Sequence, residues 1–262
     1  KRIGKKQSEP ASVDPLILET LVEPYRDQVE IQTKVMISKP LPGIVREVME
    51  NGHDLVIKRP VSRFGMKQFL SNTDWLLFSK CRCPVWFNEL SPSRSSQNIL
   101  AVVDVSDECF PAELTLRKEL NRQILEMASS MALTENGQLH IMQAWHLFGE
   151  SALRSGFIRM PEEKILTSAE QLRQKHAAKL DTLMDGLAGS LGREALDTVN
   201  PQIHLVKGAE QNEIPALANL IAADLVIMGT IVRAGVSGYI MGNNAKVILK
   251  QLDSSLLVIK PL

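Results

Sequence analysis

The chain has 262 residues, and its 30 Lys and Arg residues balance its 30 Asp and Glu residues, so the formal net charge is zero. This balance argues against a general nucleic-acid binder, which needs a basic excess to displace counterions from phosphates. Three cysteines do not make a disulfide framework, and no apolar run approaches the ~18 residues of a transmembrane helix. We therefore expect a cytoplasmic protein with no membrane or nucleic-acid partner.

Residues 1–90 contain three short apolar runs that predict buried strands. These runs lie at residues 31–35, 55–57 and 85–87. A polar segment that contains several Ser and Pro residues follows at residues 90–97, and this composition predicts a linker.

The rest of the chain predicts a complete alternation of strands and helices. We expect strands at residues 98–105, 139–145, 202–206, 225–228 and 256–259. We expect helices at residues 111–133, 161–187, 214–222 and 244–252. Strands that alternate with helices imply a parallel sheet with right-handed crossovers, so this part of the chain predicts a five-stranded parallel sheet.

An internal repeat relates the two parts of the chain. Residues 54–57, Asp-Leu-Val-Ile, recur at residues 224–227, an offset of 170 that holds without a gap to residue 80. A slip of two residues then aligns residues 83–87 with residues 255–259. A long fixed offset marks duplicated units, so we predict two related domains.

The two domains are expected at residues 1–90 and 98–262, and the first is incomplete at its N-terminus. It lacks the first two strands and the helix between them, which at the repeat offset correspond to roughly 70 residues before Lys1. The predicted fold class is α/β, with open parallel five-stranded sheets of Rossmann-like type. Apolar fifth strands in both units can pair edge to edge, which predicts an intramolecular pseudo-dimer of the two domains.

Ligands of open parallel sheets bind at the carboxyl ends of strands where the strand order reverses, and two places in the second domain fit this rule. Asp104 follows the apolar run at residues 99–103 and can accept hydrogen bonds from a ribose or a base, although an acid there also suits a helix or turn cap. The other place is the loop at residues 228–244, whose glycines let backbone N–H groups approach phosphate oxygens. The same glycines are equally expected in a flexible surface loop.

The order of motifs in the second domain resembles the latter half of a universal stress protein domain. Asp-Leu-Val-Ile-Met-Gly-Thr at residues 224–230 is followed by Arg233, by Gly242-Asn243 and by Leu-Leu-Val-Ile-Lys-Pro at residues 256–261. The resemblance is to the tandem-domain type of this family, and it implies a stress-response protein built from two such units.

In its ATP-binding branch, the family places adenine and ribose near an aspartate after the opening strand and near a second-strand position, with the phosphates along the glycine loop. Residues 102–106 resemble the opening strand, so Asp104 takes the first place and Ala144 falls at the second. The resemblance implies ATP or AMP as the cofactor. The residues implied to hold it are Asp104, Ala144, Met228, Gly229, Arg233, Gly242 and Asn243.

The glycine loop departs from the ATP-binding pattern, which runs Gly, two residues, Gly, nine residues, Gly and then Ser or Thr. Gly229 and Gly242 match the first and third glycines, but Val232 stands at the second, and Asn243 replaces the hydroxyl residue. Val232 places a stiff branched side chain where the backbone meets a phosphate, so a weakened or altered nucleotide site is expected. The first domain has Arg59 at the first glycine, which predicts that its phosphate loop is lost.

Other kinds of site find little support in the residues. The five histidines lack Cys or acid neighbours at ligand spacing, so no metal site is expected. There is no Gly-x-Ser-x-Gly elbow, and the residues after Asp104 lack the glycine pair of an ATP pyrophosphatase. Lys260-Pro261 resembles a receiver-domain signature, but the third strand ends without the aspartate that a receiver phosphorylates. We therefore expect no enzyme.

The sequence favours a cytoplasmic stress-response protein that binds an adenine nucleotide in its second domain. The alternative is a regulatory or protein-interaction module that binds no nucleotide. Whether the purified protein carries or binds an adenine nucleotide distinguishes the two.

Overall fold

The computed structural model describes residues 15–36, 40–59, 74, 77–78, 80–88, 97–107, 111–156, 160–229, 247–248 and 251–260. The chain divides into two compact units, Lys1–Gly43 and Ile44–Leu262. In the smaller unit, helix α1 (Pro15–Val22) leads into a short 3-10 helix, η1 (Glu23–Tyr25), and then into a segment without regular secondary structure. Helix α2 (Pro40–Asn51) spans the boundary between the units.

Within the described part of the larger unit, seven strands form one sheet, in the order β1-β2-β7-β6-β3-β4-β5. The strands are β1 (Val56–Lys58), β2 (Val85–Phe87), β3 (Asn98–Val102), β4 (Gln138–Trp145), β5 (Gln202–Lys207), β6 (Leu225–Gly229) and β7 (Ser255–Ile259). Neighbours among them are parallel except for β2 and β7, which are antiparallel. The fold is therefore α/β with a mixed, mostly parallel sheet.

The antiparallel pair of β2 and β7 joins strands from the two halves of the repeat. Trp86 lies opposite Leu257, with one further residue pair on each side, so the edge-to-edge pairing predicted for these strands is confirmed. Because this pairing continues the hydrogen bonding from one set of strands to the other, the described strands make a single mixed sheet and not two wholly parallel ones.

The register of the strands changes the sequence-based alignment of the two related segments by one residue. Val56 lies opposite Val85 in the pair of β1 and β2, and Val226 lies opposite Leu256 in the pair of β6 and β7. Val56 and Val226 are 170 residues apart, whereas Val85 and Leu256 are 171 apart, so the register aligns the two segments with a slip of one residue. The slip of two residues expected from the sequence is therefore wrong. Apolar residues run through both segments, so composition alone does not fix their alignment.

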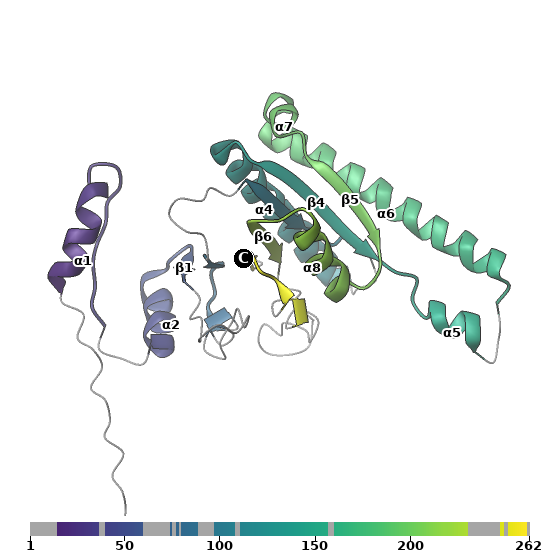
Figure 1. Ribbon diagram of the computed structural model, residues 1–262, viewed down its shortest axis with the longest axis horizontal. Helices are drawn as coiled ribbons and strands as arrows, with labels where there is room; N and C mark the ends of the chain where they lie inside the picture. Colours follow the sequence, from purple (N-terminus) through teal and green to yellow (C-terminus); the bar gives the residue numbers. More distant parts are fainter. Residues whose placement is uncertain are drawn as a thin grey trace, which may run out of the picture. The chain divides into compact units, whose positions relative to one another are not determined.

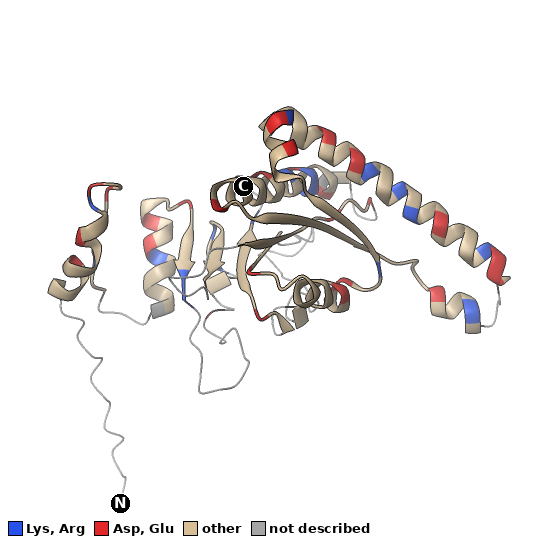
Figure 2. Cartoon of the chain, turned by 45° about the horizontal axis from the view of Figure 1, so that its top comes forward, with Lys and Arg blue, Asp and Glu red and all other residues tan. Residues whose placement is uncertain are grey.

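Helices cover both faces of the sheet. On one face lies α8 (Glu210–Leu220), and on the other lie α4 (Pro111–Glu135) and α6 (Glu162–Leu191), as Figure 1 shows. The shorter α7 (Arg193–Val199) packs against α4 and α6, and α5 (Glu150–Ser155) packs against α6. Strands covered on both faces are apolar at successive positions. Figure 2 shows the corresponding pattern, with charged residues along the helices and almost none on the central strands.

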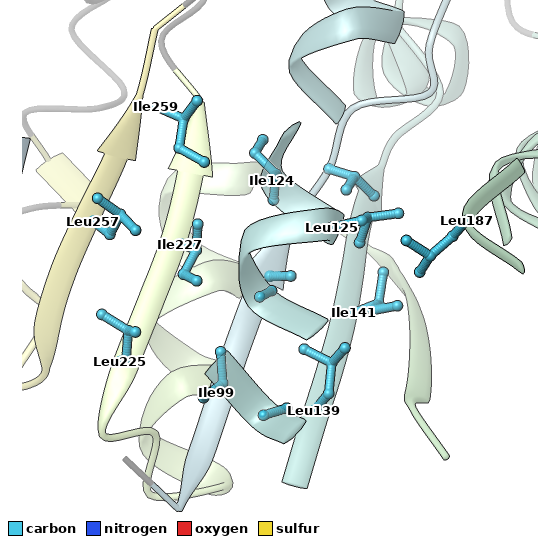
Figure 3. Close-up of a cluster of buried hydrophobic side chains, with 14 of the residues drawn as sticks. Ile99, Ile124, Leu125, Leu139, Ile141, Leu187, Leu225, Ile227, Leu257 and Ile259 are labelled. Carbon is cyan, nitrogen blue, oxygen red and sulfur yellow. The ribbon is translucent and has the colours of Figure 1, made fainter. Parts of the chain in front are cut away.

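The core between the sheet and α4 is built from alternate residues of the strands. Ile99 of β3 and Ile227 of β6 belong to the same buried cluster as Ile124 and Leu125 of α4 (Figure 3). Successive side chains of a strand point to opposite faces of the sheet. The strand residues that alternate with those of this cluster therefore face the α8 side. Burial of each such side chain stabilises the fold by about 1.5–3 kcal/mol.

Asp224 ties together the first residues of three strands. Its carboxylate accepts hydrogen bonds from the backbone N–H groups of Gln97 and Asn98, both at 3.0 Å. Its own N–H donates to the carbonyl of Asn98 at 2.9 Å, and its carbonyl accepts from the N–H of Ser255 at 2.9 Å. The amino ends of β3, β6 and β7 are therefore held in fixed register by one residue.

Among the elements that differ from the sequence-based predictions, two have a clear physical reason. Residues 31–35, predicted as a strand, have no regular secondary structure. Their counterpart β5 pairs with β4, and the described residues before position 31 contain no strand that could act as such a neighbour. The helix predicted at residues 214–222 is α8, which begins earlier, at Glu210. Acidic residues stabilise the first turn of a helix, and Glu210 and Glu213 lie in this turn.

His140 and His204 meet on neighbouring strands β4 and β5. Nδ1 of His140 lies 3.0 Å from Nε2 of His204, the distance of a hydrogen bond in which one ring donates to the other. Burial lowers the pKa of both imidazoles, and the charge on a protonated His204 lowers the pKa of His140 further. The pair is therefore stable when both rings are neutral.

Acid should destabilise the fold through this pair. Because the folded-state pKa of each ring lies below its ordinary value of 6.5, the unfolded chain takes up protons first. The free energy of unfolding should then fall as the pH drops below that value, and urea denaturation at about pH 7.5 and about pH 5.5 measures the loss. His204→Gln should reduce this pH dependence, whereas His146→Gln, which changes an exposed histidine, should keep it. The same pH dependence in both variants would contradict this role.

Candidate functional site

The strand order reverses at β3, and a cavity lies at this point. The chain leaves β3 through α4 to reach β4, and it later passes through α8, on the opposite face, to reach β6 on the other side of β3. The carboxyl ends of β3 and β6 lie side by side, with Val102 opposite Met228. A cavity of about 70 Å³ opens there between α4 and α8. This switch-point cavity occupies the place where open parallel sheets bind their ligands.

Three of the candidate binding residues line the switch-point cavity. Asp104 reaches it from the segment after β3, and Met228 and Gly229 reach it from the end of β6. Ala144 lies near the carboxyl end of β4 with 6% of its surface exposed, and it is not among the described residues that line the cavity. The remaining loop residues lie outside the described part of the chain: Arg233, Gly242, Asn243 and also Val232.

Asp104 forms an ion pair with Arg117 of α4. Nη1 of Arg117 lies 2.5 Å from Oδ2 of Asp104, and the backbone N–H of Ser106 donates to Oδ1 at 2.9 Å. Arg117 also donates to the backbone oxygen of Ser106 at 3.2 Å. Both carboxylate oxygens therefore already have a donor, and a ligand that uses Asp104 must share these oxygens or displace Arg117.

Two buried side-chain amides hold the backbone around Asp104. The amide of Asn121 accepts from the N–H of Asp104 at 3.0 Å and donates to its carbonyl at 2.8 Å. The amide of Gln143 accepts from the N–H of Val105 at 2.8 Å and donates to the carbonyl of Ala144. Because hydrogen bonds of buried groups are costly to break, the position of Asp104 is set before any ligand arrives.

Acidic groups dominate the polar part of the lining. Asp104, Glu113 and Glu210 line the switch-point cavity together with the guanidinium of Arg117. Burial raises the pKa of the Glu210 carboxyl, the negative charge of Asp104 raises it further, and Arg117 opposes both effects. Carboxylates accept hydrogen bonds and repel phosphates, so the cavity suits the hydroxyl and amino groups of a ligand.

Gly229 lets α4 approach the end of β6. A Cβ atom built at this position would lie 2.3 Å from Cδ2 of Leu120, far inside normal contact distance. Leu120 is buried and belongs to the core beneath α4. The structure therefore gives Gly229 a packing role, beside any contact that its backbone makes with a ligand.

The polar residues of α4 and α8 that line the cavity were not predicted from the sequence. Glu113, Arg117 and Asn121 are spaced by four residues and share one face of α4. A polar row at helical spacing, on a helix whose inner face is otherwise apolar, was the signal available for finding them. For Glu210 the signal was its place in an acidic first turn directly after a strand.

The protein family follows from a match that covers the whole cavity. The model of the universal stress protein family matches residues 96–260, which contain β3 to β7 and all the lining residues. The chain belongs to the universal stress protein family. The family resemblance found in the motifs of the second domain is thereby confirmed.

Several relatives of this universal stress protein carry the name universal stress protein E. The protein of that name from Escherichia coli strain K12 is 28% identical over 89% of this chain and 69% of its own length. A homologue from Haemophilus influenzae is also 28% identical, over 89% of this chain and 71% of its own length.

Solved structures share the fold over almost the whole chain. A protein of unknown function from Pseudomonas aeruginosa has a TM-score of 0.72 at 24% identity, covering 97% of this chain and 80% of its own. A universal stress protein from Archaeoglobus fulgidus has a TM-score of 0.57 at 15% identity, covering 97% of this chain and 84% of its own. At these identities the likeness shows the fold.

The residues that the structure describes contain neither a metal-ligand cluster nor a membrane-spanning helix. They include no group of three or more His, Cys, Asp or Glu side chains placed to hold a metal ion. None of the helices that the structure describes has both the length and the apolar character needed to cross a membrane.

Cys81 and Cys83 are buried thiols, and burial raises the pKa of Cys81 to about 11, which disfavours the reactive thiolate.

Replacement of Gly229 by alanine should destabilise the protein by roughly 1–3 kcal/mol, because the new Cβ atom overpacks against Leu120. Urea denaturation of Gly229→Ala measures the loss. Leu120→Ala makes room for the added methyl group, so the double variant should lose less stability than the sum of the two single variants. Additive losses would show that the two residues do not constrain each other.

Proposed function

We propose that this universal stress protein binds an adenine nucleotide in its second repeat unit, residues 98–262, and acts in a cytoplasmic stress response. The observation that carries the proposal is the switch-point cavity, which Asp104, Met228 and Gly229 line together. The family pattern in the sequence assigns nucleotide contacts to the same three positions. The topology and the sequence motif thus indicate the same place, the carboxyl ends of β3 and β6.

The adenosine end of the nucleotide is the part that fits the switch-point cavity. Ribose hydroxyls and the adenine amino group are donors, and the carboxylates of Asp104, Glu113 and Glu210 are acceptors. Phosphates are repelled by the same carboxylates. In this proposal they extend toward the glycine loop, where Gly242 and Asn243 supply backbone and amide donors.

Binding in this site is expected to be weak. The cavity of about 70 Å³ is well below the roughly 300–1,000 Å³ of typical ligand pockets, so a nucleotide has to move Arg117 or neighbouring groups. Rearrangement of the Asp104–Arg117 pair costs part of the binding free energy. Val232, at a glycine position of the ATP-binding pattern, weakens the phosphate contacts as well.

The first repeat unit, residues 1–90, is proposed to bind no nucleotide. Lys58 corresponds to Met228 at the offset of 170, and it forms an ion pair with Asp74, whose side chain is fully buried. A charged pair thus occupies the position at which the second unit offers an apolar side chain. The antiparallel pairing of β2 and β7 supports a pseudo-dimer of the two units.

Calorimetric titration of the full chain with ATP, AMP and adenosine tests the nucleotide site. Asp104→Ala should weaken the binding of all three by about 1–3 kcal/mol, because it removes an acceptor for the ribose or base. Asp107→Ala is a matched control on the same segment, since Asp107 pairs with Lys175 and Lys179 and does not line the switch-point cavity. Equal weakening by both variants would contradict the proposed contact.

Variants in the glycine loop separate the phosphate contacts from the adenosine contacts. Val232→Gly should strengthen the binding of ATP, and Gly242→Val should weaken it by roughly 1–3 kcal/mol through lost backbone hydrogen bonds. Neither change should alter the binding of adenosine. If none of the three compounds binds the parent protein at millimolar concentration, the nucleotide proposal fails in favour of a protein-interaction module.

A further inference from the structure

A second and larger space lies between α4 and α6, on the other side of the Asp104–Arg117 pair. This α4–α6 cleft has a volume of about 580 Å³, which falls within the roughly 300–1,000 Å³ typical of small-molecule sites. Asp104, Arg117 and Asn121 line both the cleft and the switch-point cavity, so the ion pair stands between the two spaces. The nucleotide site proposed above makes no use of the cleft.

The floor of the α4–α6 cleft is apolar. Leu114 and Leu125 of α4, with Leu183 and Leu187 of α6, line it. Figure 3 shows Leu125 and Leu187 side by side between the two helices. Leu125 and Leu187 are buried, while Leu114 and Leu183 remain half-buried and accessible. Such a floor holds the apolar body of a ligand by removing its surface from water.

The rim of the cleft carries an excess of positive charge. Its charged lining residues are Arg117, Lys118, Arg122 and Lys179 against Asp104 and Asp107. Arg117 and Lys179 pair with the two aspartates, and Arg122 pairs with glutamates along α4. Lys118 forms no ion pair with any residue that the structure describes, so it is the cation free to meet a ligand.

Gly186 lines the cleft without contributing a side chain. Glycine inside a helix is less stable than alanine by roughly 0.5–1 kcal/mol, yet Gly186 lies within α6. A Cβ atom built there meets no atom within 4 Å, so close packing does not explain the glycine. Gly189, nearly one turn further along α6, is equally open but does not line the cleft. The two glycines therefore form a matched pair for substitution.

We propose that the α4–α6 cleft is a binding site for a small amphiphilic organic anion. Its apolar body lies on the leucine floor over Gly186, and its single carboxylate or similar anionic group meets the ammonium of Lys118 at the rim. The site differs from the nucleotide site in ligand chemistry, and the two adjoin at the wall formed by Asp104, Arg117 and Asn121.

Calorimetric titration of the full chain with octanoate and with 1-octanol tests the charge requirement. The two compounds share an alkyl chain, and only octanoate carries a charge, so octanoate should bind several-fold more tightly. Lys118→Gln should weaken octanoate roughly threefold, in keeping with one exposed ion pair, and should leave octanol unchanged. Lys164→Gln, on an exposed part of α6 away from the cleft, should change neither. Equal affinities of the parent protein for octanoate and octanol overturn the proposal.

The two glycines test the position of the site. Gly186→Leu should reduce the affinity for octanoate roughly tenfold or more because the new side chain fills the cleft, while Gly189→Leu should leave it unchanged. Both substitutions change helix propensity alike, so stability does not separate them. No octanoate binding at millimolar concentration, or an equal loss in both variants, overturns the proposal. Adenosine binding should be the same in both variants, which keeps a failure here distinct from a failure of the nucleotide proposal.

Discussion

The parallel pairing of β3 with β4 on one side and with β6 on the other is the constraint on which the rest of the structure depends. Crossovers between parallel strands are right-handed, so helices that leave toward opposite sides of β3 must cover opposite faces of the sheet. The amino-terminal parts of α4 and α8 then flank the carboxyl ends of β3 and β6. A cavity at this place is a consequence of topology, whereas the side chains that line it, Asp104, Arg117 and Glu210, are set by the sequence.

The Asp104–Arg117 ion pair gives the molecule two adjoining spaces with different chemistry. On the α8 side, acidic groups collect around a small cavity, and on the α6 side, leucines and cations line a larger cleft. Asn121 and Gln143 fix the backbone that presents Asp104, so the carboxylate has little freedom to move. Arg117 is the longer and more adaptable partner, and any movement of its side chain alters the walls of both spaces.

Much of the fold could be predicted from the sequence, because apolar runs bounded by turn residues mark the strands, as at Val85–Phe87. The long-range contacts could not be predicted in the same way. His140 and His204 are separated by 64 positions and meet only through the register of β4 and β5. In the candidate site, strand ends bring Asp104, Met228 and Gly229 together as the topology requires. Arg117 joins them through the packing of α4 on the sheet, and the polar row at helical spacing does not by itself show which strand ends it meets.

Asp224 lies at the amino ends of the strands, opposite the proposed ligand sites, and holds the starts of three strands. It also opens the Asp-Leu-Val-Ile segment that recurs, as residues 54–57, in the first half of the chain. The residues that follow this segment differ between the two halves of the chain, with Gly229 in one and Arg59 in the other. The hydrogen bonds that set the strand register and the proposed ligand sites thus lie at opposite ends of the strands. Substitutions after the strands can therefore change what a proposed ligand site holds without disturbing the hydrogen bonds that set the strand register.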